Sequence, residues 1–146
     1  MKEMTAGERR AFLLHGTRTA KLATVRPDGR PHVAPIWFVL DQSAEAGDAV
    51  VFTTGAGTVK GRAIRRDPRL AILVDDETPP FAYVLIEGTA EVSDDLDQML
   101  EWATRIGARY MGDERAAEFG RRNAVAGELL VRVTPTKVLA YAGISD

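Results

Sequence analysis

The sequence predicts a mainly β fold, a small closed or partly closed barrel of about six strands with short helices outside it. Apolar runs of strand length recur along the chain, from residues 19–25 to residues 128–143. Turn signals join neighbouring runs, most clearly Pro27-Asp28-Gly29, where proline presets φ and glycine accepts a positive φ. The helical patterns between the runs are short. These observations favour strands that are mostly connected as hairpins.

A short helix is expected first, because Thr5 and Glu8 have the spacing of a capping box and Gly16 closes the segment. Strands follow at residues 19–25, 30–41 and 48–54. Residues 69–76 are nearly all apolar, which predicts a strand that is covered on both faces.

Two long strands and two helices complete the chain. Gly88 predicts a bulge or bend in the strand at residues 81–93, and Pro135 marks a bulge or edge position in the last strand. Ser93 or Asp94 is expected to cap the helix that follows. The apolar residues of that helix at near-helical spacing are Leu96, Leu100, Ala103 and Ile106. A second short helix is expected at residues 113–124.

The composition is that of one globular domain, residues 1–146, with 45% hydrophobic and 27% charged residues. A formal net charge of −2 argues against a nucleic-acid-binding protein. Cysteine is absent and the two histidines have no nearby acidic cluster, so no metal site is expected. No signal peptide or membrane-spanning run is recognisable, and we expect a cytoplasmic protein.

The stretch TTGAGTVKGRAIRRDPR, residues 53–69, concentrates cations in an acidic chain. It leaves a strand and enters a helix for which Thr58 is the expected N-cap. Lys60 falls in the first turn, where the helix dipole is already positive, so an exposed lysine there costs about 0.3–1 kcal/mol. A bound phosphate reverses that sign, because free N–H groups, the Thr58 hydroxyl and the Lys60 ammonium can converge on it.

A solvated basic helix face is the alternative interpretation. Arg65, Arg66 and Arg69 fit it, since cations suit the C-terminal end of a helix. For Thr58 and Lys60 the residues alone leave both interpretations open. Neither a Walker loop nor a dinucleotide fingerprint is present, so this reasoning leads only to a phosphate-bearing ligand.

Three stretches in this order and spacing carry a resemblance to a known family: AKLATVRPDGRPHVAPIWFVLD, VVFTTGAGTVKGRAIRRDPRLAILVDD and YVLIEGTAEV. They resemble the split β-barrel flavin-binding superfamily that includes pyridoxamine 5′-phosphate oxidase, and within it the branch of deazaflavin (coenzyme F-420)-dependent reductases. The likeness covers residues 17–93 and is echoed by LLVRVTPTKVLAY. It implies a six-stranded antiparallel split barrel and a homodimer with two cofactor sites at the interface.

The resemblance also implies which residues bind the cofactor. Its phosphate would lie where the third strand meets the following helix, at Thr53, Thr54, Thr58 and Lys60, with Arg62 close by. The segment VAPIW corresponds to the strand that passes along the ring, which implies Val33, Ala34, Pro35, Ile36 and Trp37. Phe81 and Tyr83 fall where the family places residues that flank the ring or the cofactor tail, contributed by the partner subunit.

An acidic glutamyl tail on the cofactor could be met by an arginine. The candidates are Arg62, Arg65, Arg121 and Arg122. The short-range surroundings of the last two, RRNAVAGE, are interpreted as ordinary surface.

Three positions depart from the pyridoxamine 5′-phosphate oxidase pattern, because Ala34, Val39 and Val59 stand where that enzyme has cations. At about 1.5–3 kcal/mol for each charge-assisted hydrogen bond, their loss weakens binding of a dianionic flavin phosphate. The pattern therefore favours the deazaflavin branch over vitamin-oxidase activity.

No catalytic residue of the chain's own is assigned, because no nucleophile–base pair, carboxylate pair or metal cluster can be assembled. A cofactor that carries the chemistry accounts for this. The leading hypothesis is an oxidoreductase that transfers a hydride from reduced coenzyme F-420 to an electron-poor double bond of a small molecule, with protonation by water, Tyr83 or His32. The alternatives are an oxidoreductase of the same fold that uses flavin mononucleotide (FMN), and a non-catalytic protein that binds flavin, deazaflavin or haem.

Overall fold

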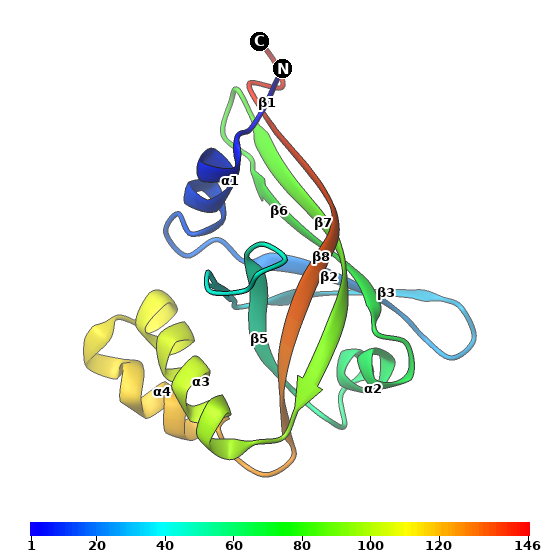
Figure 1. The fold of residues 1–146 in the computed structure, drawn as a ribbon, viewed down its shortest axis with the longest axis vertical. Coiled ribbons are helices and arrows are strands. Elements are labelled where there is room, and N and C mark those ends of the chain that lie inside the picture. Colours follow the sequence, from blue (N-terminus) through cyan, green and yellow to red (C-terminus); the bar gives the residue numbers. More distant parts are fainter.

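A computed structural model describes residues 1–146 as one antiparallel β-sheet with four α-helices around it (Figure 1). The strands are β1 (Lys2–Glu3), β2 (Ala20–Val25), β3 (Pro31–Ile36), β4 (Val39–Asp41), β5 (Ala49–Gly55), β6 (Arg69–Asp76), β7 (Ala82–Ser93) and β8 (Glu128–Ala142). The helices are α1 (Ala6–Leu13), α2 (Val59–Arg66), α3 (Leu96–Met111), the 3-10 turn η1 (Asp113–Arg115) and α4 (Ala116–Asn123). None of the helices is both long and apolar enough to cross a membrane.

The order of strands shows how the sheet curls on itself. Along the hydrogen-bonded path the order is β3-β2-β6-β7-β8-β5-β4, with β1 paired to β8. β3 and β4 therefore lie at opposite ends of the path, yet only Trp37 and Phe38 separate them in the chain. The two ends of the sheet are joined by this two-residue connection and not by a hydrogen-bonded ladder.

The predicted mainly β antiparallel fold is confirmed, with eight strands in place of the expected six. The strand expected at residues 30–41 is divided into β3 and β4, and the short β1 was not predicted. The bulge at Gly88 is confirmed by a shift in register between β7 and β8, where Gly88 lies opposite Pro135.

Two sequence expectations were wrong in detail. α3 buries Met99, Trp102, Ala103 and Ile106. The expected Leu96 and Leu100 are 47% and 42% exposed. Its N-cap is Asp95, whose side chain accepts from the N–H groups of residues 97 and 98, and not Ser93 or Asp94.

The strand at residues 69–76 is also covered differently from the expectation. Buried residues alternate along β6, so the chain covers only one of its faces. Leu73 on the other face is 37% exposed. The apolar run that predicted two covered faces thus leaves one apolar face open to the outside of this chain.

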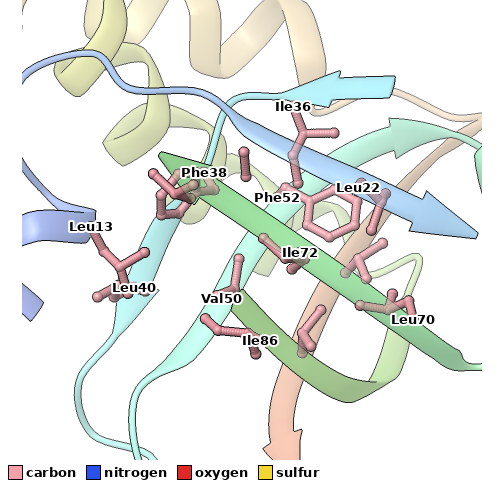
Figure 2. Close-up of a cluster of buried hydrophobic side chains, with 14 of the residues drawn as sticks. Leu13, Leu22, Ile36, Phe38, Leu40, Val50, Phe52, Leu70, Ile72 and Ile86 are labelled. Atoms are coloured by element: carbon pink, nitrogen blue, oxygen red, sulfur yellow. The ribbon is translucent and has the colours of Figure 1, made fainter. Parts of the chain in front are cut away.

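The inner face of the sheet encloses the main hydrophobic core. Twenty buried residues form one cluster, and the members from β2, β3, β5, β6 and β7 point toward one another in Figure 2. Leu22, Phe52 and Ile72 in this cluster are each no more than 1% exposed. Burying side chains of this size is worth about 1.5–3 kcal/mol each, so this core is the main source of stability.

A second, smaller cluster lies between the outer face of the sheet and α3. It contains Val39, Val51, Met99, Trp102, Ile106 and Leu130. β5 contributes to both clusters, because Val50 and Phe52 belong to the main core while Val51 between them belongs to this one. α3 and α4 lie side by side on this part of the sheet (Figure 1).

Two neighbouring residues of α3 hold the connection between β3 and β4. The Tyr110 hydroxyl donates to the carbonyl of Arg18 (2.7 Å) and accepts from the N–H of Phe38 (3.1 Å). The Arg109 guanidinium donates to the carbonyls of Phe38 (2.7 Å), Leu13 (2.7 Å) and Gly16 (3.0 Å). Burial raises the pKa of Tyr110 and lowers that of Arg109, which is consistent with half-buried polar groups that find their partners on the backbone.

Replacing Arg109 by lysine should destabilise the fold, because one ammonium group cannot reach three carbonyls that a planar guanidinium spans. We expect Arg109→Lys to lower the free energy of unfolding by about 1–3 kcal/mol. Chemical denaturation measures this change. The matched control is Arg105→Lys on the exposed side of the same helix, where the pair with Glu101 is worth at most about 0.5 kcal/mol. Equal stability of the two variants would show that Arg109 does not hold the connection.

Candidate functional site

A pocket of about 320 Å³ lies where β5 ends and α2 begins, between the β3–β4 connection and α4. Five residues predicted to bind a cofactor line it: Pro35, Ile36, Trp37, Thr53 and Lys60. The others lining it are Ile106, Phe119, Arg122, Asn123 and Glu128. The pocket therefore joins the strand predicted to lie along a ring to the turn predicted to hold a phosphate.

The turn from β5 into α2 is stabilised by its own hydrogen bonds. Thr58 is the N-cap of α2, as predicted: its hydroxyl oxygen accepts from the N–H of Gly61 (3.0 Å) and donates to the carbonyl of Gly55 (2.8 Å). Thr54 is buried, with its hydroxyl 3.3 Å from that of Thr58. Both hydroxyls thus stabilise the turn, and neither residue lines the pocket, so their contact with a phosphate stays a prediction.

Gly61 allows the first turn of α2 to lie against the end of β5. A Cβ added at Gly61 would come within 2.1 Å of the carbonyl oxygen of Gly55. Because no larger residue fits there, the start of the helix is held close to the strand. The N–H groups of Val59 and Lys60 have no acceptor inside the helix and are available to a ligand.

Two cations face the pocket from different elements. Lys60 is the second residue of α2, is partly buried, and forms no ion pair with any acidic side chain within 4.0 Å. Arg122 comes from the last turn of α4, where its guanidinium lies 5.2 Å from the centre of the Phe119 ring. Two cations without carboxylate partners make this pocket suited to an anion.

A carboxylate also lines the pocket. Glu128 is the first residue of β8 and lies opposite Gly55 in the sheet. Burial raises the pKa of Glu128, and the positive charge of Lys60 opposes that rise. An acidic side chain therefore shares the pocket with the two cations.

Aromatic rings form the wall of the pocket nearest α3. Trp37 stacks on Tyr110 with ring centres 4.9 Å apart and an angle of 3° between the planes, and Phe119 lies 6.0 Å from Trp37. Trp37 remains 38% exposed. The tryptophan is thus held from one side by a ring that is itself fixed through its hydroxyl, and its remaining surface is accessible to a ligand.

α4 reaches the pocket because it packs closely against α3. A Cβ added at Gly120 would lie 2.1 Å from the Thr104 hydroxyl oxygen on α3. This close contact fixes the position of α4, whose Phe119, Arg122 and Asn123 line the pocket.

The remaining predicted site residues lie elsewhere in the chain. Val33 is 63% exposed on β3, Ala34 is partly buried, and Arg62 is exposed on α2; none of these lines the pocket. Phe81 and Tyr83 line a separate pocket of about 480 Å³ together with Leu73. One chain therefore brings together the phosphate turn and the ring strand, but not these two aromatic residues.

Sequence reasoning missed most of what α4 and the start of β8 contribute. The sequence of residues 121–128 predicts ordinary surface, but Arg122, Asn123 and Glu128 all line the pocket. The sequence predicts Arg122 only as a candidate partner for a cofactor tail. No local pattern could have found Asn123 or Glu128, because they reach the pocket through contacts with distant segments.

Comparison with known proteins identifies relatives of the chain. The family model described as pyridoxamine 5′-phosphate oxidase matches residues 6–142. Among curated proteins, the chain is 31% identical over 91 residues to the F420H(2)-dependent biliverdin reductase of Mycobacterium tuberculosis (strain CDC 1551 / Oshkosh). That match covers 62% of this chain and 62% of the relative, so less than two thirds of the relative is spanned.

Solved structures share the fold. A conserved hypothetical protein from Mycobacterium tuberculosis superimposes with a TM-score of 0.82 at 24% identity, over 99% of this chain and 92% of that one. An F420 reductase superimposes with a TM-score of 0.65 at 28% identity, over 88% of this chain and 94% of that one.

Proposed function

The chain belongs to the pyridoxamine 5′-phosphate oxidase family, and on that premise we propose that it is a deazaflavin-dependent oxidoreductase. Reduced coenzyme F-420 is the proposed hydride donor, and the acceptor is an electron-poor double bond of a small molecule. Two relatives named as F420-dependent enzymes support the choice of cofactor. The missing cations at Ala34, Val39 and Val59 support it against FMN.

The observation that carries the proposal is the pocket that joins β3, β5, α2 and α4. Its cations, Lys60 and Arg122, have no carboxylate partner at ion-pair distance and suit a cofactor phosphate, to which the first N–H groups of α2 add donors. Pro35 and Trp37 extend the same pocket along β3 and provide apolar surface for a ring. A volume of about 320 Å³ suits the phosphate end of such a cofactor and part of its ring.

In this proposal the chain binds and orients, and the bound deazaflavin supplies the hydride chemistry. Lys60 and Arg122 hold the phosphate, which fixes the cofactor along β3. Trp37 is held against Tyr110 and lines the pocket with its remaining surface. No side chain of the pocket is assigned a covalent role, in agreement with the absence of a nucleophile–base pair among its residues.

Removing the Lys60 ammonium tests the assignment of the phosphate. Lys60→Ala should raise the Kd for coenzyme F-420 about tenfold or more, because it removes a charge-assisted contact worth about 1.5–3 kcal/mol. A fluorescence titration measures both proteins. The control is Lys137→Ala, an exposed lysine of β8 that does not line this pocket, which should change the Kd less than about twofold. An unchanged Kd for Lys60→Ala would show that the phosphate does not bind at this pocket.

We propose that a second copy of the chain packs on the open face of the sheet, the face of β3, β2 and β6 that the chain itself does not bury. Val33 lies opposite Ala23, and Ala23 lies opposite Ala71, so a row of small and apolar residues crosses β3, β2 and β6. Leu73 belongs both to this face and to the pocket that contains Phe81 and Tyr83. The family resemblance implies a homodimer with cofactor sites at the interface. The position of Phe81 and Tyr83 next to the open face agrees with this.

A charge on the open face should separate the two copies. Val25 is 45% exposed on β2, and Val25→Asp is expected to convert a dimer into a monomer, because it would place a charged group in an apolar contact between the two copies. Size-exclusion chromatography with light scattering measures the mass. Val125→Asp, a similarly exposed valine in the loop before β8, should leave the dimer intact. A wild-type protein that is monomeric at all concentrations would refute the proposal.

A further inference from the structure

We propose that Glu128 determines which phosphate the pocket accepts: it favours a phosphodiester, which carries one negative charge, over a phosphomonoester, which carries two. The inference rests on the proposed function, because it concerns the same pocket. It adds a specificity-determining residue that the family resemblance does not include.

The position of Glu128 places its carboxylate beside the phosphate turn. Glu128 pairs with Gly55, the last residue of β5. A Cβ added at Gly55 would lie 3.7 Å from the carboxylate Oε1 of Glu128 and 3.2 Å from a methyl carbon of Thr58. The carboxylate therefore lies over the turn that leads into α2, on the side where Lys60 lines the pocket.

The charged groups that face Glu128 are few. α2 contributes Lys60 and α4 contributes Arg122, whereas β5 and α3 contribute only the uncharged Thr53 and Ile106. Glu128 has no cation within 4.0 Å, so its charge is not neutralised by direct contact. Burial raises the pKa of Glu128, which means that this site already disfavours negative charge on the carboxylate.

A phosphate bound between the two cations is repelled by this carboxylate in proportion to its own charge. FMN ends in a phosphomonoester, which carries a charge of about −1.5 to −2 near neutral pH. Coenzyme F-420 carries its phosphate as a diester between the ribityl chain and the glutamyl tail, with a single negative charge. Glu128 therefore penalises the monoester more strongly than the diester, and the pocket selects by charge as well as by shape.

The repulsion between Glu128 and the phosphate also makes phosphate binding depend on the protonation of Glu128. The charge of a diester is constant across the range in which Glu128 titrates, and no histidine lines the pocket. Protonation of Glu128 removes the repulsion, so diester binding should tighten as the pH falls toward the raised pKa of Glu128. At higher pH the carboxylate is charged and binding is weaker.

The test compares two ligands that share one ring: coenzyme F-420, and the deazaflavin ribityl chain that ends in a phosphomonoester. Their Kd values are measured by fluorescence titration at about pH 8. Glu128→Gln should tighten binding of the monoester about tenfold and of the diester about threefold. For each ligand, the Kd of Glu128→Gln is compared with the Kd of the wild type. The contribution of the ligand's tail is the same in both and cancels. Glu45→Gln, in the exposed loop after β4, is the control and should change neither Kd.

Glu128→Asp keeps the charge and should keep the preference, which provides a second test if Glu128→Gln is unstable. On going from about pH 8 to about pH 5, the Kd for coenzyme F-420 should fall by a larger factor for the wild type than for Glu128→Gln, because titration of the ligand's own carboxylates is common to both proteins. Equal gains for both ligands, or weaker binding, would overturn the inference, and the proposed function would stand if Lys60→Ala still weakened both. If neither ligand bound, the proposed function and the inference would fall together.

Discussion

The two-residue connection between β3 and β4 is the constraint on which the rest of the structure depends. These strands are the two ends of the hydrogen-bonded sheet, and Trp37 and Phe38 are all that separates them. No ladder closes the sheet at this point, so both backbone groups of Phe38 need partners from elsewhere. Arg109 and Tyr110 supply them, and Phe38 itself is fully buried in the core.

The same arrangement creates the candidate site. Because the backbone of Phe38 is held from α3, Trp37 projects outward and stacks on Tyr110. α4 follows α3 closely through Gly120 and brings Arg122 within the pocket. The contacts of α3 with the connection between β3 and β4 therefore both close the sheet and form one wall of the pocket.

The sequence was sufficient to predict those features that depend only on residues close together in the chain. Thr5 and Thr58 cap their helices because a hydroxyl reaches an N–H three residues ahead, which spacing alone predicts. The sequence was insufficient to predict which face of a helix is buried when two apolar patterns compete. In α3, a stripe that begins with Leu96 and Leu100 is as regular as the one that begins with Met99 and Trp102 and packs on the sheet. Both stripes continue through the buried Ala103 and Ile106, so only the surroundings decide between them.

In the candidate site, too, the sequence predicts what depends on nearby residues and not what depends on distant ones. The turn at Thr58 and Lys60 could be recognised from a strand, glycines and a helix start, whereas Asn123 and Glu128 join it only through the folding of α4 and β8. The proposed function requires that this pocket binds a deazaflavin in preference to a flavin. Parallel titrations of the apo protein with coenzyme F-420 and FMN, at the same salt concentration, test it most directly. Tighter binding of coenzyme F-420 is the expected result, and tighter binding of FMN would contradict the account.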